Sequence, residues 1–189
     1  MIEENLTALN LPQESPLPED IQKYYDICQE KLGLVPNVLA AYGFSAERLR
    51  AFSQMYNALM LAESDLSKAE REMIAVAVSA ENHCLYCLVA HGAALRQLTG
   101  DPVLADTIAA NYRHAKITPR QRAMLDFAVK MTKASATIEE EDREALRAAG
   151  FSNRAIWDVA EVAAFFNMTN RMSSAVAMRP NTTYHGMAR

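Results

Sequence analysis

The sequence has few cysteines, no long apolar run and no excess of positive charge. Three cysteines in 189 residues are too few, and odd in number, for the disulfide framework of a small secreted protein. No uninterrupted apolar run approaches the roughly 18 residues that a membrane-spanning helix needs. The net charge is −4 and Lys and Arg are scattered, so nothing indicates attraction to nucleic acid or to anionic lipid.

The start of the chain also lacks the basic segment and apolar run of a secretory signal. We therefore expect a cytoplasmic protein. In that compartment a close cysteine pair is typical of catalysis or metal binding rather than of a structural disulfide. Half of the residues are apolar and 22% are charged, which indicates one folded domain with a full hydrophobic core.

Strand signals are missing as well, because no segment alternates convincingly between apolar and polar residues. Helix signals recur instead, beginning with Pro18 and two acidic residues and an expected end at Gly33. We predict an all-α domain of about eight helices over residues 18–189. Residues 1–17, which contain the turn-forming Pro12 and Pro16, are predicted to be an N-terminal arm.

Several predicted helices begin with a capping box, in which a hydroxyl caps the helix and Glu or Gln three residues later reaches back. Such boxes occur at Ser67–Glu70, Thr118–Gln121 and Thr137–Glu140. Asp101 before a proline and Ser152 mark two further starts.

Residues 66–78 and 117–129 form a weak internal echo. Both segments open with a capping box, and Arg71 and Arg122 fall at the same place, as do three apolar positions. This pattern is typical either of an old duplication or of two amphipathic helices with common caps. On the same offset Glu72, Cys84, Cys87 and His91 face Ala123, Ser135, Ile138 and Asp142, so only the first copy has the reactive residues.

The reactive residues are concentrated between Glu72 and His91. If a helix begins after a break at Asn82 or His83, with Asn82 as N-cap, Cys84 lies in its first turn. Cys84, Cys87 and His91 then share one helix face, with the two cysteines within disulfide reach. A helix N-terminus favours a thiolate, and His91 lies one turn after Cys87, which makes Cys87 the better expected nucleophile.

Glu72 joins this group only if the chain reverses near Asn82–His83, because twelve residues of continuous helix would separate it from Cys84 by about 18 Å. It begins an almost wholly apolar stretch, where a carboxylate needs a partner. We interpret Glu72 as a buried proton-relay group. The alternative is a surface ion pair with Lys68 or Arg71.

The spacing E-x11-C-x2-C-x3-H resembles that of the alkylhydroperoxidase D-like proteins of the carboxymuconolactone decarboxylase superfamily. The segments L-V-P-N-V (34–38), Y-C-L-V-A-H-G (86–92), A-G-F-S (149–152) and F-N-M-T-N-R (166–171) resemble its peroxidase-related branch. The resemblance covers nearly the whole chain. It implies an all-helical alkylhydroperoxidase D-like domain, and a homo-oligomer that is trimer-based or hexameric.

The resemblance also implies a cofactor-free thiol peroxidase active in antioxidant defence. Cys87 would attack a hydroperoxide substrate, Cys84 would resolve the product into a disulfide, and Glu72 and His91 would relay protons. An unidentified thiol or dithiol partner would supply electrons. Relatives have a histidine where this chain has Tyr86, a poor base at neutral pH, so the relay here is expected to be shorter or slower. His83 lies nearby at another offset; it and Tyr86 are accessory candidates.

Three other functions remain open at this stage. Zn²⁺ could bind Cys84, Cys87 and His91, although no second ligand pair is evident. A decarboxylase of the same superfamily, or an oligomeric scaffold with a vestigial redox site, would not need the cysteine pair. A thioredoxin-like fold is excluded because its Cys-x-x-Cys requires a βαβ context.

Outside this stretch the expectations are structural. Cys28 falls on the apolar face of its helix and is expected to be an inert buried thiol. Asn167, Asn170 and Arg171 are expected to satisfy backbone groups, with an interface or site role as the alternative. His114 and His185 are expected at the surface.

Overall fold

The computed structural model describes residues 6–9 and 11–189, which form helices and no strand. The predicted all-α class is therefore confirmed. In chain order the α-helices are α1 (Glu19–Leu32), α2 (Asn37–Tyr42), α3 (Ala46–Tyr56), α4 (Lys68–Glu81), α5 (Leu85–Thr99), α6 (Pro102–Asn111), α7 (Pro119–Ala134), α8 (Glu140–Ala148), α9 (Asn153–Ala175) and α10 (Thr183–Gly186). A π-helical turn (Asn57–Leu61) continues α3, and 3₁₀ turns follow α6 (Tyr112–His114) and α7 (Ser135–Thr137). The described part has ten α-helices rather than about eight, since elements as short as α10 carry too little periodic pattern to be recognised.

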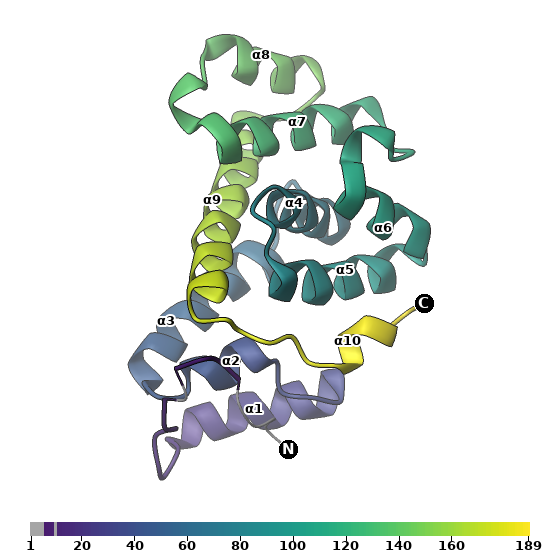
Figure 1. The fold of residues 1–189 in the computed structure, drawn as a ribbon. Coiled ribbons are helices and arrows are strands. Elements are labelled where there is room, and N and C mark those ends of the chain that lie inside the picture. The colour runs from purple at the N-terminus through teal and green to yellow at the C-terminus, as the bar shows by residue number, and fades with distance from the viewer. Residues whose placement is uncertain (1–5, 10) are drawn as a thin grey trace.

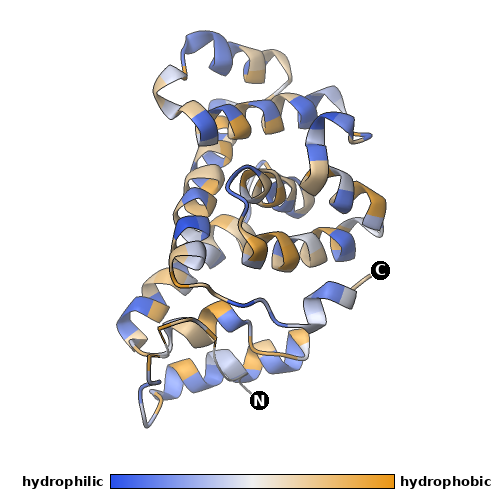
Figure 2. Cartoon of the chain, in the orientation of Figure 1, coloured by the Kyte–Doolittle hydropathy of each residue, from blue (hydrophilic) through white to orange (hydrophobic). Residues whose placement is uncertain are grey.

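Helix α4 lies at the centre of the molecule and contacts α5, α6, α7 and α9. Its residues from Met73 to Val78 are all buried, which explains why the segment is apolar on every side. The 23-residue α9 runs along one side, from α7 and α8 at one end to α1–α3 at the other (Figure 1). The α8 segment is largely hydrophilic (Figure 2), and Leu146 is its one buried residue.

Most predicted helix starts are confirmed. Ser67 and Thr118 form full capping boxes, and Asp101 and Ser152 each accept a backbone N–H bond at the start of a helix. Ser45 caps α3 in the same way. Gly33 ends α1 in the left-handed conformation, as expected. The box at Thr137–Glu140 is wrong. The Thr137 hydroxyl donates to the Ala134 carbonyl within a 3₁₀ turn, and Glu139 becomes the N-cap, with its N–H bonded to Asp142 at 2.8 Å.

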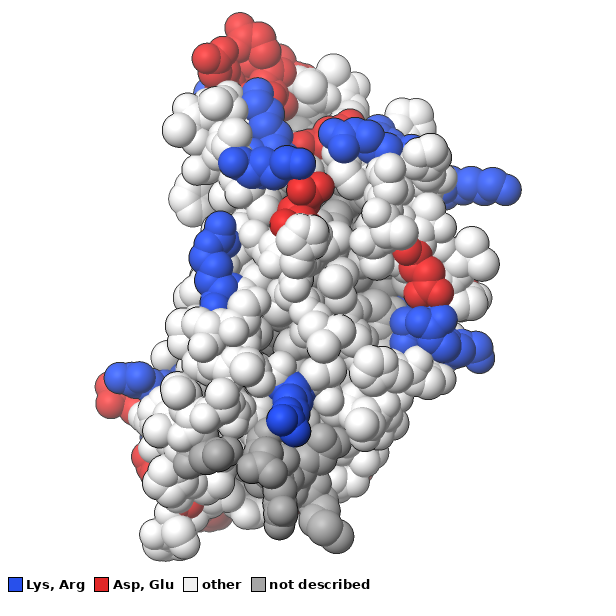
Figure 3. Space-filling view, viewed as in Figure 1, with Lys and Arg blue, Asp and Glu red and all other residues white. Residues whose placement is uncertain are grey.

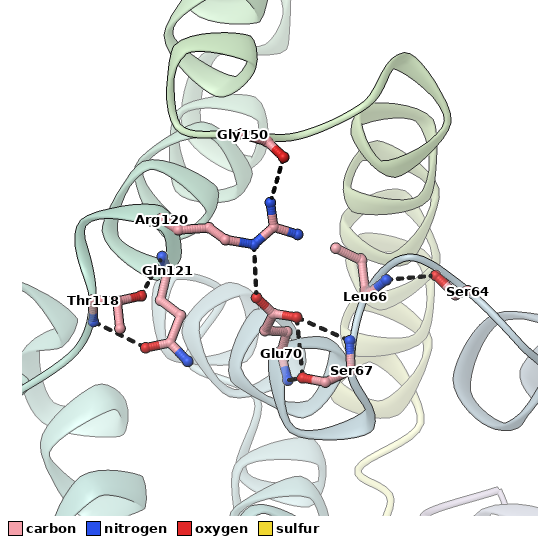
Figure 4. A network of polar contacts seen from close by, with 8 residues as sticks. All are labelled: Ser64, Leu66, Ser67, Glu70, Thr118, Arg120, Gln121 and Gly150. Atoms are coloured by element: carbon pink, nitrogen blue, oxygen red, sulfur yellow. Dashed lines mark hydrogen bonds and ion pairs between the residues drawn. The ribbon is translucent and has the colours of Figure 1, made fainter.

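The two capping boxes of the internal echo lie close together in space (Figure 4). Arg120, in the first turn of α7, approaches the carboxylate of Glu70 at 3.4 Å and donates to the Gly150 carbonyl at 2.9 Å. The first turns of α4 and α7 are thus joined to each other and to the loop that precedes α9.

The matched arginines of the echo make matched contacts. Arg71 donates to the carbonyls of Leu59 and Ala62, at the end of the π-helical turn before α4. Arg122 donates to the carbonyls of Tyr112, Arg113 and Ala115, at the 3₁₀ turn before α7. In both copies the arginine in the second turn of the helix satisfies carbonyls left free where the preceding helix ends. Caps and core pattern alone do not require this contact, so it favours the duplication.

The described part of the N-terminal arm is held by backbone bonds. Ala8 donates to the Val176 carbonyl at 2.8 Å, and Arg179 donates to the Leu6 carbonyl at 3.0 Å. The Gln13 side chain donates to the Ala40 carbonyl at 2.7 Å. The arm therefore lies against the end of α9 and against α2. The division into an arm (1–17) and a domain (18–189) stays a prediction, and residues 1–5 and 10 lie outside the described residues.

Charged side chains of both signs are scattered over the face drawn in Figure 3, with a broad uncharged area between them. Among the helices that the structure describes, none is long and apolar enough to cross a membrane.

Candidate active site at the start of α5

The chain reverses direction between α4 and α5, as the sequence required if Glu72 was to approach the thiols. Asn82 ends α4, so the expectation that it would be the N-cap of the next helix is wrong. His83 adopts a left-handed φ of 52°, which histidine tolerates better than most residues. Cys84 is then the N-cap of α5, and its N–H donates to the Ser79 carbonyl at 3.0 Å. One irregular residue is thus enough to bring two helices back side by side.

Glu72 and His91 face each other across this helical hairpin. His91 Nδ1 and Glu72 Oε2 are 2.7 Å apart, and the two side chains are 13% and 8% exposed. The alternative in which Glu72 pairs with Lys68 or Arg71 at the surface is therefore wrong. A buried carboxylate bonded to an imidazole is an arrangement that can hold and move a proton.

Aromatic rings enclose the His91 imidazole. The Phe166 ring meets it edge-on at 4.6 Å between centroids, and the Tyr56 ring lies at 6.5 Å. Burial raises the pKa of the Tyr56 phenol well above its ordinary value, and the nearby Glu72 adds to this effect. Tyr56 comes from α3 and was not among the predicted site residues, because nothing in the local pattern indicates that the end of α3 lies against α5.

Cys84 and Cys87 are both free thiols and both buried, at 1% and 3% exposed. The pKa of Cys84 is lowered to about 6. The main cause is the hydrogen bond from the Cys87 thiol, opposed by burial and reinforced by the Cys87 amide and the Ser174 and Ser173 hydroxyls. The pKa of Cys87 is raised, because its proton is held in that same bond and its site is buried. The reduced pair therefore carries one shared negative charge, centred on Cys84 at the helix N-terminus.

The two accessory candidates occupy different surroundings. Tyr86 is buried, and its phenol oxygen accepts the Val38 N–H at 3.0 Å, which fastens α2 to the start of α5. Burial raises the Tyr86 pKa well above its ordinary value, so the phenol is a poor base here. His83 is exposed at the turn. Tyr86 thus has a structural role, because its phenol oxygen reaches the Val38 N–H. A histidine at this position has a shorter side chain and would not make the same bond.

Asparagines from α9 lie beneath the turn. The Asn82 amide donates to Asn167 at 3.0 Å and to Asn170 at 2.9 Å. Asn170 in turn donates to the Ser79 hydroxyl at 3.0 Å. Asn170 also lies close enough to the Cys87 sulfur to lower its pKa, against the larger raising effects. Arg171 bonds within α9, to the carbonyl and side chain of Asn167.

An apolar pocket of about 80 Å³ shares part of its wall with the residues packed around the thiols, although neither cysteine is among its described lining residues. It lies between the N-terminal arm, α2, α3 and the end of α9, and Arg48 is the one charged residue among the described residues that line it. Its wall shares four apolar residues with the cluster that contains Cys84 and Cys87, namely Val38, Ala41, Val176 and Met178. A fifth wall residue, Ser173, contributes to the pKa of both thiols.

The zinc alternative requires three ligands at one point. Within residues 6–9 and 11–189, no group of three or more His, Cys, Asp or Glu side chains is placed to hold a metal ion. The thiol pair and the Glu72–His91 pair remain two separate pairs.

The expected burial of Cys28 and the expected exposure of His114 and His185 are confirmed. Cys28 is buried and its pKa is raised by burial, as expected for an inert thiol. His114 and His185 are exposed. Of the three polar residues of α9, Asn170 lies against the thiol pair, so its surroundings go beyond the backbone role that was expected.

Together these features define a class: an all-helical protein with a Cys-x-x-Cys pair at a helix N-terminus, beside a buried glutamate–histidine pair. The model of the carboxymuconolactone decarboxylase family matches residues 46–103, which include all four of these residues. The chain is 63% identical to an uncharacterized peroxidase-related protein from Silicibacter sp. TM1040, covering 100% of this chain and 99% of that one with a TM-score of 0.96. The chain belongs to the carboxymuconolactone decarboxylase superfamily, in its alkylhydroperoxidase D-like group.

Two further structures extend the comparison. A protein from Ralstonia eutropha JMP134, described as an alkylhydroperoxidase AhpD core and uncharacterized peroxidase-related protein, is 46% identical over 99% of this chain and 98% of that one, with a TM-score of 0.94. The debrominase Bmp8 is 16% identical over 100% of this chain and 98% of that one, with a TM-score of 0.78, and shares the fold alone. No curated protein sequence matches this chain.

Proposed function

We propose that this protein is a thiol-dependent hydroperoxide reductase that cycles a Cys84–Cys87 disulfide. The observation that carries the proposal is the pair of buried, hydrogen-bonded thiols at the N-terminus of α5, one of them with a pKa of about 6. Such a pair holds a nucleophilic thiolate at neutral pH, with its resolving partner already in contact. The peroxidase-related descriptions of the two most similar structures support the same reaction class.

The reaction balances without a cofactor. A thiolate attacks the terminal oxygen of R–O–OH, the O–O bond breaks, and the alkoxide leaves as an alcohol after taking up a proton. The resulting sulfenic acid is attacked by the second thiol, which releases water and forms the disulfide. A dithiol partner then returns two electrons and two protons by thiol–disulfide exchange.

We assign the first attack to Cys87 and resolution to Cys84, as the resemblance to the alkylhydroperoxidase D-like proteins implies, although the lowered pKa of Cys84 by itself favours the opposite order. In the reduced pair the negative charge lies on Cys84, so Cys87 must first pass its proton to Cys84, and the hydrogen bond between them is a direct path. Among the described residues no hydrogen bond joins His91 to either thiol. The Glu72–His91 pair would therefore exchange protons with the departing alkoxide through an intervening molecule, either water or the peroxide itself.

The apolar pocket supports an organic rather than an inorganic peroxide. A hydrocarbon group between the arm, α2 and α3 would be desolvated, at about 0.8 kcal/mol per buried CH₂ group. Hydrogen peroxide has no such group and would gain nothing from the pocket.

One experiment tests both the reaction and the assignment. Reduced protein is treated with one equivalent of cumene hydroperoxide, and the thiols are mapped by mass spectrometry with dimedone present to trap sulfenic acid. We expect a Cys84–Cys87 disulfide in the wild type and trapped Cys87 in Cys84→Ser. Sulfenic acid trapped on Cys84 in Cys87→Ser, together with none trapped on Cys87 in Cys84→Ser, would reverse the two roles. If the cysteines stay reduced in all three proteins, the proposed redox function is contradicted and a vestigial site is favoured.

The remaining parts of the function are proposals of the same kind. A cytoplasmic dithiol protein is the proposed reductant. A homo-oligomer, trimer-based or hexameric, is the proposed assembly, and it accords with the exposed apolar side chains of Leu85, Val103 and Trp157, each more than 60% exposed. Light scattering at several concentrations measures this directly, and a monomer throughout would remove the proposal. Measurement of bound metal in the purified protein tests the zinc alternative.

A further inference from the structure

Asn170 is the polar side chain most deeply placed near the thiols. It lies towards the end of α9, at 0% exposed. A buried amide destabilises the fold unless its donors and acceptor are bonded. Its oxygen accepts from the Asn82 amide at 2.9 Å, and its nitrogen donates to the Ser79 hydroxyl at 3.0 Å.

Both partners belong to the segment of chain that leads into Cys84. Ser79 belongs to the last turn of α4, and its carbonyl accepts the Cys84 N–H at 3.0 Å. Asn82 ends α4 and starts the reversal. Through these two hydrogen bonds Asn170 connects α9 to the end of α4 and to the turn that leads into Cys84.

The amide nitrogen has a second hydrogen. A side-chain amide carries two N–H donors, and the Ser79 hydroxyl takes one of them. The Asn170 amide also lies beside the Cys87 sulfur, where it lowers the thiol pKa. Ser173, three residues later on α9, acts in the same direction on both thiols and donates to the Met178 sulfur at 3.8 Å.

We propose that Asn170 is a positioning residue of the cysteine pair: its amide holds the α4–α5 turn and stabilises the negative charge of the reduced thiols, and so sets how readily the disulfide is reduced. This inference rests on the proposed redox function. It also gives a role to the F-N-M-T-N-R segment, which the disulfide chemistry alone leaves unexplained. A donor that stabilises the thiolate favours the reduced form, so its loss makes the disulfide harder to reduce.

Asn167 provides a matched control one turn earlier on the same helix. It accepts from the same Asn82 amide at 3.0 Å, and its own nitrogen donates to Thr132 and to the Ala163 carbonyl. It makes no hydrogen bond to either thiol among the described residues. Asn170→Asp and Asn167→Asp introduce the same charge into the same network. A carboxylate at 170 can still accept from Asn82, but it loses the donor beside Cys87 and adds a negative charge there, and both changes disfavour the thiolate.

The test measures the thiols without any peroxide. The pH profile of iodoacetamide alkylation gives the thiolate pKa, and equilibration at pH 8 in dithiothreitol redox buffers gives the reduction potential. We expect Asn170→Asp to raise the midpoint of alkylation by about one pH unit and to shift the equilibrium about tenfold towards the disulfide. A tenfold shift corresponds to about 30 mV. The Asn167→Asp protein is expected to stay within about twofold of the wild type.

Equal shifts in both variants, or none in Asn170→Asp, overturn the proposal. Asn170→Thr removes the amide without adding charge and is measured alongside; because its hydroxyl is too short to reach both the turn and Cys87, it must shift both readouts in the same direction. An unshifted, folded Asn170→Thr protein also overturns the proposal. A wild-type protein that has the expected thiol properties but consumes no hydroperoxide would refute the proposed function and leave this inference standing.

Discussion

The helical hairpin α4–α5 and the segment α7–α8 begin alike and end differently. Both first helices open with a capping box, and both place an arginine in the second turn that donates to carbonyls of the preceding turn. After α4 a single left-handed residue returns the chain into the 15-residue α5. After α7 a 3₁₀ turn leads into the nine-residue, mostly polar α8.

The equivalent positions of the two copies are used for different purposes. His91 bonds Glu72 in the interior, whereas Asp142, at the matching position, bonds Lys130 at 2.7 Å and caps α8. Ser135 and Ile138, which match the cysteines, lie in or beside the 3₁₀ turn rather than at the start of a long helix. The start of the repeat therefore supplies scaffold in both copies, and the reactive residues depend on the helix that follows it.

The largest expected effect comes from removing the thiols of the first copy. Cys87→Ser is expected to lower hydroperoxide turnover about 1,000-fold or more, because it removes the proposed attacking thiol and leaves Cys84 without a partner for the disulfide. Cys28→Ser, a buried cysteine in α1, is the control and should retain wild-type turnover. A Cys84→Ser/Cys87→Ser protein with Ser135→Cys and Ile138→Cys should remain inactive. Recovery of activity would show that the spacing alone suffices.

The second-largest effect is expected from the buried carboxylate of Glu72. Glu72→Gln keeps the shape and a bond to His91 but removes the charge, so turnover should fall about 100-fold, as for loss of a general acid–base group. Glu70→Gln is the matched control: it lies two residues earlier and pairs with Arg120 instead. Steady-state kinetics with an organic hydroperoxide measure both, and an equal loss in the two variants would contradict a role specific to Glu72.

A difference in thiol reactivity should appear with pH. Because the Cys84 pKa is lowered to about 6, its alkylation rate should rise as pH passes 6 and level off near 7. Burial raises the pKa of Cys28, so its rate should still be rising at pH 9. Mass-spectrometric alkylation between pH 5 and 9 follows each cysteine separately. Parallel profiles would show that Cys84 is an ordinary buried thiol.

The matched arginines allow the scaffold itself to be compared. Arg71 is 3% exposed and Arg122 is partly exposed, so Arg71→Ala should lower the free energy of unfolding by about 2 kcal/mol and Arg122→Ala by about 1 kcal/mol. Urea denaturation gives both values. A larger loss for Arg122→Ala would mean that the second copy is the more stabilising one.

The smallest effects belong to the caps. Ser67→Ala and Thr118→Ala each remove a hydroxyl that accepts a first-turn N–H, which typically costs about 1 kcal/mol. The two losses should agree within about 0.5 kcal/mol by thermal or urea denaturation. A clear inequality would show that the two boxes are equivalent in sequence only.

Much of the helical framework could be predicted because its signals are local. Ser67, Thr118 and Ser152 are N-caps that can be recognised from the four residues at each helix start, and Gly33 is a recognisable C-cap. Thr137 misled the prediction because its hydroxyl had a competing carbonyl in the preceding turn, at Ala134. Asn82 misled it because asparagine suits both a helix start and the residue that ends one.

The candidate site was predicted only in part. Glu72 and His91 could be paired from their positions once a reversal was assumed, and the contact at 2.7 Å agrees with this. Tyr56 and Asn170 could not be placed, because α3 and α9 approach the hairpin from more than 15 residues away in sequence. The thiol pKa values depend on Ser173 and Ser174, which the sequence separates from Cys84 by almost ninety residues.

The all-helical class and most helix starts could be predicted from the sequence, because each depends on neighbours within a turn or two, and the Glu–Cys–Cys–His spacing could be identified by its resemblance to a family. The groups that surround those four residues depend on tertiary contacts: the asparagines of α9 under the turn, Val38 on Tyr86, and the apolar pocket that shares its wall with the thiol cluster. Charge distribution on a buried thiol pair is set by whatever packs against it. Those groups come from segments far away in the sequence, so the spacing of residues around the cysteines does not predict them.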